Sequence, residues 1–431
     1  MNSRAMFRFC LAIAIAVGIG TDALARESDE MNAAKLRQLH LRSKAVSPKI
    51  FTRAIAQYGA PAIKSVPNWS EYYAADGFDS SGNPNRNWYT NTLGNPPRAP
   101  GKMLPGRLSA SPGTTVINAP IIPVIIDLRE ADGTPRFVNG NPLVSSPMPF
   151  VDLVLQSPLF SNASWASSPV PTQFNDAVQR AQFIAQAGDD WHTLLAPGVK
   201  NARTVKLLRG DYTFTLNPDG TCCQAILVDL NALTRAMFPS APGDTGSLIG
   251  DAMNAGDITP QDVSTFLFPN VFAYQGTTSN CCLYGFHSYY AEPGDPASGA
   301  SERRYVFNYA SWISPGLFGS SVQDVTGLSH ELAEIFNDPF VASDGVQNVT
   351  PWWLSGGNCQ NTLETADATE GLPRATFPVV MPNGYQYHPA NQALVQWFKR
   401  EFPSSALHGA YSFPDEGVLT NLSDPQRAGC Q

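Results

Sequence analysis

Residues 327–336 of this chain read Gly-Leu-Ser-His-Glu-Leu-Ala-Glu-Ile-Phe. The apolar residues recur at the spacing of an amphipathic helix, and they frame the motif H-E-x-x-E at His330, Glu331 and Glu334. Side chains four residues apart share one face of a helix, with Cβ atoms about 5–6 Å apart. His330 and Glu334 are therefore predicted to hold one metal ion. Glu331 lies beside them as the base that takes a proton from a metal-bound water.

The same helical pattern has a simpler interpretation, in which it is a surface helix with a polar outer face. An apolar stripe runs along the predicted helix and consists of Val325, Leu328, Leu332, Ile335 and Phe336. His330 and Glu334 lie roughly opposite this stripe. In the functional interpretation, the stripe packs on the core while the two polar side chains line a cleft.

A catalytic zinc ion usually takes three protein ligands and a water molecule. The predicted third ligand is Glu364, in the segment E-x-x-D, with Asp367 as the partner that orients the imidazole of His330. The alternative is that both residues cap or decorate a surface helix. His287 and His388 are reserve ligands, although a single histidine in a strand is more often packed or hydrogen-bonded.

One histidine and two carboxylates form a harder and more anionic site than two histidines and one carboxylate. Zinc is the expected metal, and manganese, iron or calcium are the competing divalent ions. The added negative charge should raise the pKa of a bound water molecule. The sequence therefore predicts either a hydrolase that is slow at neutral pH or a structural metal site.

The first 25 residues have the features of a signal peptide. Arg4 and Arg8 precede an apolar run over 9–20, and Ala23-Leu24-Ala25 matches a cleavage site. The protein is therefore predicted to be secreted or periplasmic. No later stretch reaches the roughly 20 apolar residues of a membrane span. The net charge of −8 argues against a nucleic-acid partner.

Cys10 lies in the signal peptide, and six further cysteines follow it: Cys222, Cys223, Cys281, Cys282, Cys359 and Cys430. An even number in an exported chain predicts disulfide bonds. Adjacent cysteines are expected to pair poorly with each other. The 222/223 pair is therefore predicted to link to the 281/282 pair, and Cys359 to Cys430, among the 15 connectivities that six cysteines allow. The C-C spacing differs from the C-x-x-C of structural zinc sites.

Two parts follow the signal peptide. Residues 26–112 are predicted to form an N-terminal helix, over 29–46, and a Pro/Gly-rich arm, which is either a wrap around the domain or a propeptide. Residues 114–431 are predicted to form one loop-rich, disulfide-stapled α+β domain with a mixed sheet. Strands are expected at 116–128, 204–216, 223–230, 270–274, 283–290 and 304–312, and helices at 171–186, 258–268 and 321–337.

Several of these motifs occur in an order that resembles the exordium-like (phosphate-induced) secreted proteins and related bacterial exported proteins. The similarity covers about residues 270–402 and rests on four segments, Gly285-Phe286-His287, 330–339, Glu364-x-x-Asp367 and 393–397. It implies secretion and a cell-wall or extracellular role, without an established reaction. In this chain, Cys359 precedes the E-x-x-D motif, and the glycine-rich stretch expected after it is missing. The helix is also similar to the zincin active-site helix, with Glu334 in place of the second histidine.

These observations leave three functional hypotheses. The first is an exported zinc-dependent hydrolase, most simply a metallopeptidase acting on a peptide or cell-wall substrate. The second is a non-enzymatic secreted or cell-wall-associated protein with a structural or vestigial metal site. The third is a glycoside hydrolase that pairs Glu331 with Glu334, and it is the least favoured because retaining enzymes present their two carboxyls from opposite sides of the bond. The sequence makes no prediction of oligomeric state.

Overall fold

The computed structural model describes residues 29–31, 33–39, 68–73, 88–93, 114–185, 187–292, 303–318, 321–339, 352–354, 358–360, 362–398 and 400–422. The predicted signal peptide lies outside these residues, as does Cys430. Within the described part of the chain, no helix is long and apolar enough to cross a membrane.

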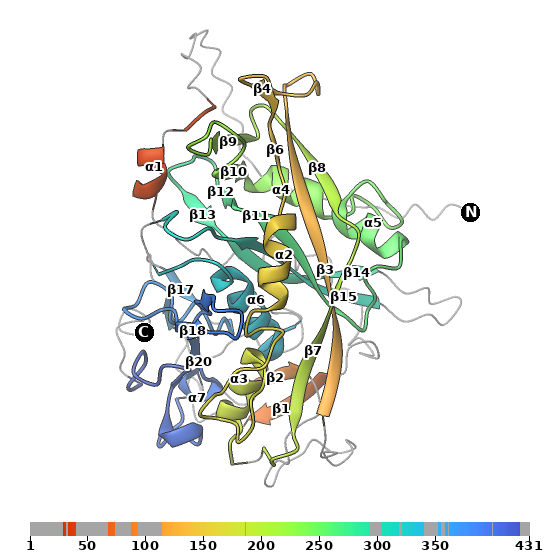
Figure 1. Cartoon of the computed structure of the whole chain (residues 1–431). Coiled ribbons are helices and arrows are strands. Elements are labelled where there is room, and N and C mark those ends of the chain that lie inside the picture. The colour runs from red at the N-terminus through yellow and green to blue at the C-terminus, as the bar shows by residue number, and fades with distance from the viewer. Residues whose placement is uncertain are drawn as a thin grey trace, which may run out of the picture.

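A seven-stranded mixed sheet organises the fold around one long strand, β3 (Thr114–Arg129), drawn in orange in Figure 1. Its parallel partners are β7 (His192–Val199), β8 (Arg203–Leu208) and β11 (Val263–Pro269). The short β6 (Val144–Ser145) pairs with its far end in the antiparallel direction. From Ala119 to Val124 every residue of β3 is buried, and this nearly continuous apolar run is why the sequence identifies it as a buried strand.

The side chains of β3 alternate between two hydrophobic cores. Ile117, Ala119 and Ile121 pack into one core cluster, whereas Ile122 and Val124 pack into another. This is the two-residue period of a strand, in which successive side chains point to opposite faces of the sheet. We refer to the face that carries Ile117 and Ile121 as the α6 face, because the helix with the H-E-x-x-E motif packs there.

The sheet continues from β11 to β15 (Arg303–Trp312), which is parallel to it, and ends at β14 (Gly285–Glu292), which is antiparallel to β15. The same alternation holds on this edge strand. Phe286 belongs to the core on the far face, and Tyr289 to the core on the α6 face. His287 lies in phase with Tyr289 and therefore faces the helix.

A second, four-stranded sheet has the order β13-β12-β10-β9. Its strands are β9 (Tyr212–Thr215), β10 (Ala225–Asp229), β12 (Val271–Tyr274) and β13 (Cys281–Leu283). Asp229 ends β10 and caps the helix α4 (Leu230–Met237), because its carboxylate accepts hydrogen bonds from the first free N–H groups of that helix. Ser247 caps α5 (Leu248–Asn254) in the same way.

The helix α6 (Thr326–Asn337) packs on β14 and β15, and every one of its residues is buried. Its apolar stripe enters the core on the α6 face together with α2 (Met148–Leu155) and α3 (Phe174–Gln182). Two glutamines of α3 fix its C-terminal end, since Gln179 and Gln182 donate to Asn337 Oδ1 at 3.2 and 3.0 Å. The interpretation as a surface helix with an exposed polar face is therefore wrong.

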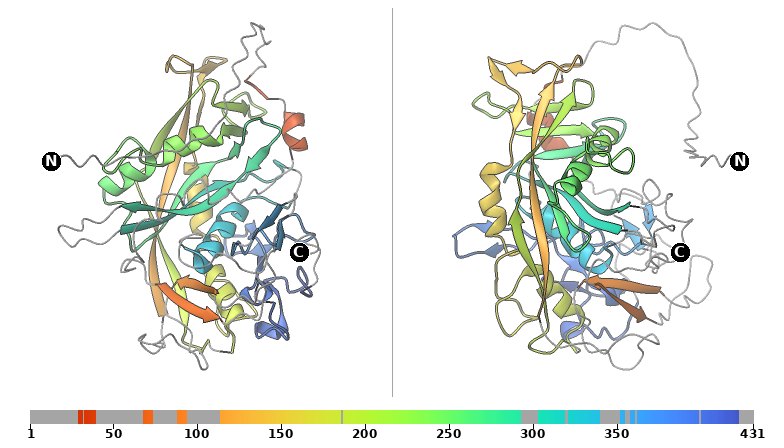
Figure 2. Two further views of the ribbon diagram at one scale, coloured as in Figure 1. Left: turned by 180° about the vertical axis from the view of Figure 1, so that it is seen from behind. Right: turned by 90° about the vertical axis from the view of Figure 1, so that its right-hand side faces the viewer.

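The C-terminal segment lies beside α6, as the blue part of the ribbon shows in Figures 1 and 2. Its elements are β16 (Trp352–Leu354), β17 (Asn358–Gln360), β18 (Val379–Val380), β19 (Gln386–Tyr387), β20 (Gln392–Ala393), α7 (Val395–Phe398), η3 (Leu407–Gly409) and β21 (Ser412–Phe413). Trp352, Leu363 and Trp397 form a small separate core there. The remaining elements are α1 (Ala33–Gln38), β1 (Asn68–Tyr73), β2 (Trp88–Leu93), β4 (Phe137–Val138) and β5 (Asn141–Pro142).

The α+β class and the mixed sheet are confirmed, and so are most of the predicted strands. The strand predicted over 204–216 is two strands, because the chain turns at Gly210 with φ of +105°. The helix predicted over 258–268 is wrong. Asp262 accepts a hydrogen bond from the Thr259 N–H within a turn, and β11 follows, with all of its residues buried in the sheet.

The predicted disulfide between the two cysteine pairs is also wrong. Cys222 bonds to Cys223, and Cys281 bonds to Cys282. In both pairs the connecting peptide bond is cis and the two Cα atoms lie 3.0 Å apart. The expectation that neighbours pair poorly, because the ring they close is strained, is therefore wrong for both pairs. The Cys359–Cys430 prediction lies outside the described residues.

Candidate metal centre

Three segments distant in sequence converge on one buried cluster of titratable side chains. The edge strand β14 contributes His287, the helix α6 contributes its H-E-x-x-E residues, and the loop over 362–370 contributes Glu364 and Asp367. The exposed fraction is between 2% and 8% for each of His287, His330, Glu331, Glu334, Glu364 and Asp367. Charged side chains are rarely so buried unless they are paired or coordinate a metal.

The first group of the cluster contains His330, Glu334 and Asp367. His330 Nε2 lies 3.0 Å from Asp367 Oδ1 and 3.3 Å from Glu334 Oε1. Because His330 and Glu334 are four residues apart on α6, the helix itself holds them on one face. These three side chains therefore place one nitrogen and two oxygens around a single point.

The second group contains His287, Glu334 and Glu364. His287 Nδ1 lies 3.3 Å from Glu334 Oε2 and 4.0 Å from Glu364 Oε2. Glu331 joins this side of the cluster, with its Oε2 also 3.3 Å from His287 Nδ1. The other ring nitrogen of His287, Nε2, is buried and has no hydrogen-bond partner among the residues described.

Tyr284 and Glu370 set the tautomer of His330. The Tyr284 hydroxyl donates its single hydrogen to Glu370 Oε1 at 2.9 Å, and its oxygen lies 3.2 Å from His330 Nδ1. A hydroxyl that already donates can only accept from another partner, so His330 Nδ1 is the protonated nitrogen. In the neutral ring, Nε2 then directs a lone pair at the oxygens of Glu334 and Asp367.

Backbone donors fix the carboxylate at the centre of the cluster. Glu334 Oε1 accepts hydrogen bonds from the N–H groups of Ala366 and Asp367, at 3.1 and 3.4 Å. This contact attaches the 362–370 loop to the helix. Although burial acts to raise the pKa of Glu334, the two neighbouring histidines lower it below its usual range.

The other ionisable side chains of the cluster shift one another's pKa values. Burial would lower the pKa of His287 and of His330, but the surrounding carboxylates raise both pKa values well above the usual range. Burial, with the adjacent Glu334 charge, raises the pKa of Glu364 well above its usual range. Burial is also the main cause of the raised pKa of Glu331. Like charges and burial act together here, as they do at many functional sites.

The donor set fits a divalent metal ion. A neutral imidazole lone pair and two carboxylate oxygens repel one another at 3.0–3.3 Å unless a proton or a cation lies between them. Imidazole nitrogens suit zinc, iron and copper, and carboxylate oxygens suit manganese and calcium. The hydrogen bond from His330 to Tyr284 is the kind of outer contact that orients a metal-binding histidine.

The structure brings the predicted metal-site residues together, except His388. Among those brought together, Glu364 has a different histidine partner from the one predicted. Glu364 groups with His287, and Asp367 stands directly against His330, where the sequence had suggested an orienting role. His388 lies at the start of α6 instead, where its Nδ1 is 2.7 Å from Asp324 Oδ2. Sequence reasoning missed Tyr284 and Glu370, and a tyrosine directly before Gly285-Phe286-His287 was the available signal.

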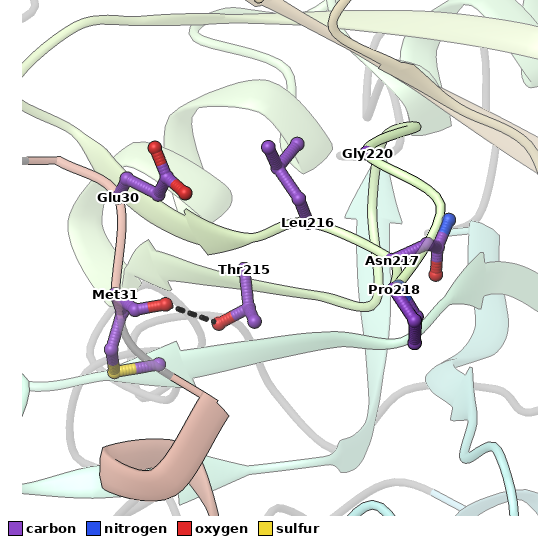
Figure 3. A pocket seen from close by; sticks show the side chains of 7 residues that line it. All are labelled: Glu30, Met31, Thr215, Leu216, Asn217, Pro218 and Gly220. Atoms are coloured by element: carbon purple, nitrogen blue, oxygen red, sulfur yellow. Dashed lines mark hydrogen bonds between the residues drawn. The ribbon is translucent and has the colours of Figure 1, made fainter.

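A hollow of about 460 Å³ lies elsewhere on the molecule, where the N-terminal segment meets the turn after β9 (Figure 3). The Thr215 hydroxyl donates there to the Met31 carbonyl at 3.1 Å. The lining residues are Glu30, Met31, Thr215, Leu216, Asn217, Pro218 and Gly220. None of them belongs to the metal cluster, and no histidine or cysteine is among them.

No family model, curated protein or solved structure matches this chain.

Proposed function

We propose that this protein is an exported metal-dependent hydrolase, with zinc as the first candidate metal and His330, Glu334 and Asp367 as its ligands. One observation carries the proposal. The contact of His330 Nδ1 with Tyr284 turns Nε2 toward two carboxylate oxygens, at 3.0 and 3.3 Å. A divalent cation can take the place of the proton between these three atoms, with the neutral ring as its nitrogen ligand.

A bound divalent metal would supply Lewis-acid polarisation of a carbonyl group and of water. We assign the proton transfer to Glu331. Its Oε2 lies 3.3 Å from His287 Nδ1 within the same cluster, it is 3% exposed, and burial raises its pKa, which brings its basicity closer to that of a base working near neutral pH. Glu331 would accept a proton from the attacking water and return it to the leaving group.

A peptide is the simplest substrate, because the helix is similar to the zincin active-site helix. The resemblance to exordium-like proteins supports export and an extracellular or cell-wall setting, and a cell-wall component is the other substrate class. Glu334 in place of a second histidine leaves less positive charge at the metal to stabilise hydroxide. The hydrolase is therefore expected to work best above neutral pH.

The test begins with elemental analysis of the purified mature protein beside His330→Ala. We expect about one equivalent or more of zinc per chain in the wild type, and a loss of about one equivalent in the variant. Hydrolysis of peptide and cell-wall substrates is then compared between the wild type and Glu331→Gln, which should lose activity while it keeps its metal. Absence of metal from the wild type, even after zinc is supplied, would contradict the proposal.

The depth of the cluster favours a second candidate, a non-enzymatic protein with a structural metal site. All six site residues are at least nine-tenths buried, and they connect β14, α6 and the 362–370 loop. A metal there would hold these three segments together. In that case chelation lowers the melting temperature, and Glu331→Gln has no activity to remove.

A further inference from the structure

We infer that the cluster holds two divalent metal ions side by side, with the Glu334 carboxylate bridging them. The inference deepens the proposed function, on which it rests, because both metal positions belong to the same centre. The first position lies among His330, Glu334 and Asp367, and the second among His287, Glu334 and Glu364. Glu334 is the only residue that the two groups share.

The two oxygens of Glu334 serve different histidines. Oε1 lies 3.3 Å from His330 Nε2, and Oε2 lies 3.3 Å from His287 Nδ1. The Ala366 N–H donates to Oε1 and fixes the rotation of the carboxylate, so that each oxygen keeps its own side. A carboxylate with one oxygen toward each of two nitrogen ligands has the arrangement of a metal bridge. Bridged metal ions in two-metal hydrolases are about 3.5–4 Å apart.

The formal charges of the cluster match two divalent cations. Four carboxylates face the two imidazoles, from Glu331, Glu334, Glu364 and Asp367. With both histidines neutral and all four carboxyls ionised, one divalent ion would leave two negative charges buried without compensation, which is costly away from water. Two divalent ions balance four carboxylates when both histidines are neutral. The alternative that gives the cluster the same net charge is one divalent metal ion together with two protons bound to cluster side chains.

Both positions offer the same chemistry. Each combines one imidazole nitrogen with two carboxylate oxygens, one of them from Glu334. The two positions should therefore accept the same kind of ion, namely zinc, manganese or iron. The second position also gives a role to His287, whose buried Nδ1 faces three carboxylates.

Each position has a residue whose removal should empty it alone. His287→Ala removes the nitrogen ligand of the second position and leaves His330, Glu334 and Asp367 unchanged. His330→Ala does the reverse. Glu334→Gln weakens both positions, because it replaces the shared carboxylate. His408→Ala is the matched control, since His408 is an exposed histidine that pairs with Glu416 and lies outside both groups.

The experiment loads the full mature protein with Mn²⁺, removes unbound ion, and measures manganese content by elemental analysis together with the electron paramagnetic resonance spectrum. Carboxylate-bridged Mn²⁺ ions are magnetically coupled, whereas an isolated ion is not. We expect about two equivalents with a coupled spectrum in the wild type and in His408→Ala. His287→Ala should hold half as much manganese and show the spectrum of an isolated ion. Circular dichroism of each variant confirms that it is folded.

The outcomes separate this inference from the proposed function. Two coupled ions support the bridged centre, whether or not any hydrolysis is detected. One uncoupled ion in the wild type, with the same content in His287→Ala, overturns the second position and leaves the proposed function in place. No bound metal overturns both. If His287→Ala does not fold, the wild-type content and coupling still decide between one ion and two.

Discussion

Gly285 lies directly against the carboxylate of Glu331. A Cβ atom added at residue 285 would come within 2.5 Å of Glu331 Oε1 and 2.9 Å of its Cγ. No side chain of another residue type fits this distance unless the glutamate moves. The edge strand β14 therefore contributes two things to the site. One is the imidazole of His287, and the other is the space at Gly285 that the Glu331 carboxylate occupies.

Gly285→Ala should displace Glu331 and lower hydrolytic activity by about 100-fold or more, the usual contribution of a positioned base. Overpacking should also lower the free energy of unfolding by about 1–3 kcal/mol. The metal content should stay close to that of the wild type, because His330 and Glu334 are unchanged. Activity, elemental analysis and urea unfolding check these three quantities.

Gly198→Ala is the matched control, because a Cβ atom at that residue meets no atom within 4 Å. It should leave activity and metal content unchanged. Full activity in a folded Gly285→Ala protein would show that Glu331 does not move the proton.

Tyr284→Phe removes the hydroxyl that accepts from His330 Nδ1 and donates to Glu370. Outer contacts of this kind usually affect metal affinity by about 10–100-fold, and we expect a loss in that range. Competition with a chromogenic chelator measures the change. Tyr411→Phe is the control, because that hydroxyl donates to the Glu401 carbonyl away from the cluster. An unchanged affinity in Tyr284→Phe would mean that another partner fixes the ring of His330.

Removal of the metal should make stability dependent on pH. In the metal-free cluster, the pKa values of His287 and His330 are raised by the carboxylates against the effect of burial, and the pKa of Glu364 is raised by burial and by Glu334. The folded protein then holds protons that the unfolded chain releases. This stabilisation is complete below the unfolded pKa values and is lost as the pH rises.

The melting temperature of the chelated protein should therefore begin to fall above pH 4.5, the ordinary pKa of Glu364, and fall further above pH 6.5, the ordinary pKa of the two histidines. Glu334, whose pKa is lowered, stays ionised over this range and adds no slope. Zinc replaces the protons, so the metal-loaded protein should have a flatter profile. Calorimetry with and without chelator measures both curves, and parallel curves would contradict the expectation.

Peptide mapping without reduction should find Cys222 joined to Cys223 and Cys281 joined to Cys282. Each pair then lies within one peptide, which is lighter than its reduced form by the hydrogens lost on oxidation. A cross-linked peptide that contains Cys223 and Cys281 would contradict this connectivity. The reduced sample provides the control masses.

The parts of the site that lie close in sequence were predicted from it. The spacing of His330 and Glu334 fixes their common face, since helix geometry is local. The apolar stripe of α6 also enters the core as its period predicts. Asp367 lies beside His330 as predicted, whereas Glu364 groups with His287 and not with His330, because only tertiary packing determines which histidine each carboxylate meets.

The wrong and missing predictions also arise from tertiary contacts or local geometry that the sequence does not show. Residues 259–262 carry a helix-start pattern, and yet the run that follows becomes β11, because it is buried between β3 and β15 where only a strand fits. The adjacent cysteines depend on a peptide-bond geometry that composition does not reveal. Tyr284 and Gly285 lie at the Gly285-Phe286-His287 segment, but that segment gives neither of them a role, and their roles follow from the contact between β14 and α6.

The loop that supplies Glu364 and Asp367 is synthesised after α6, and its backbone reaches Glu334 only when the C-terminal segment has docked. A nascent chain that ends before residue 362 would already contain the whole H-E-x-x-E helix, with Glu334, and still lack the second carboxylate of each histidine group. The cation should thus be acquired late in biogenesis, after the domain closes. In a translocated protein, this step takes place outside the cytoplasm, and the ion would then be drawn from the surroundings into which the chain is released.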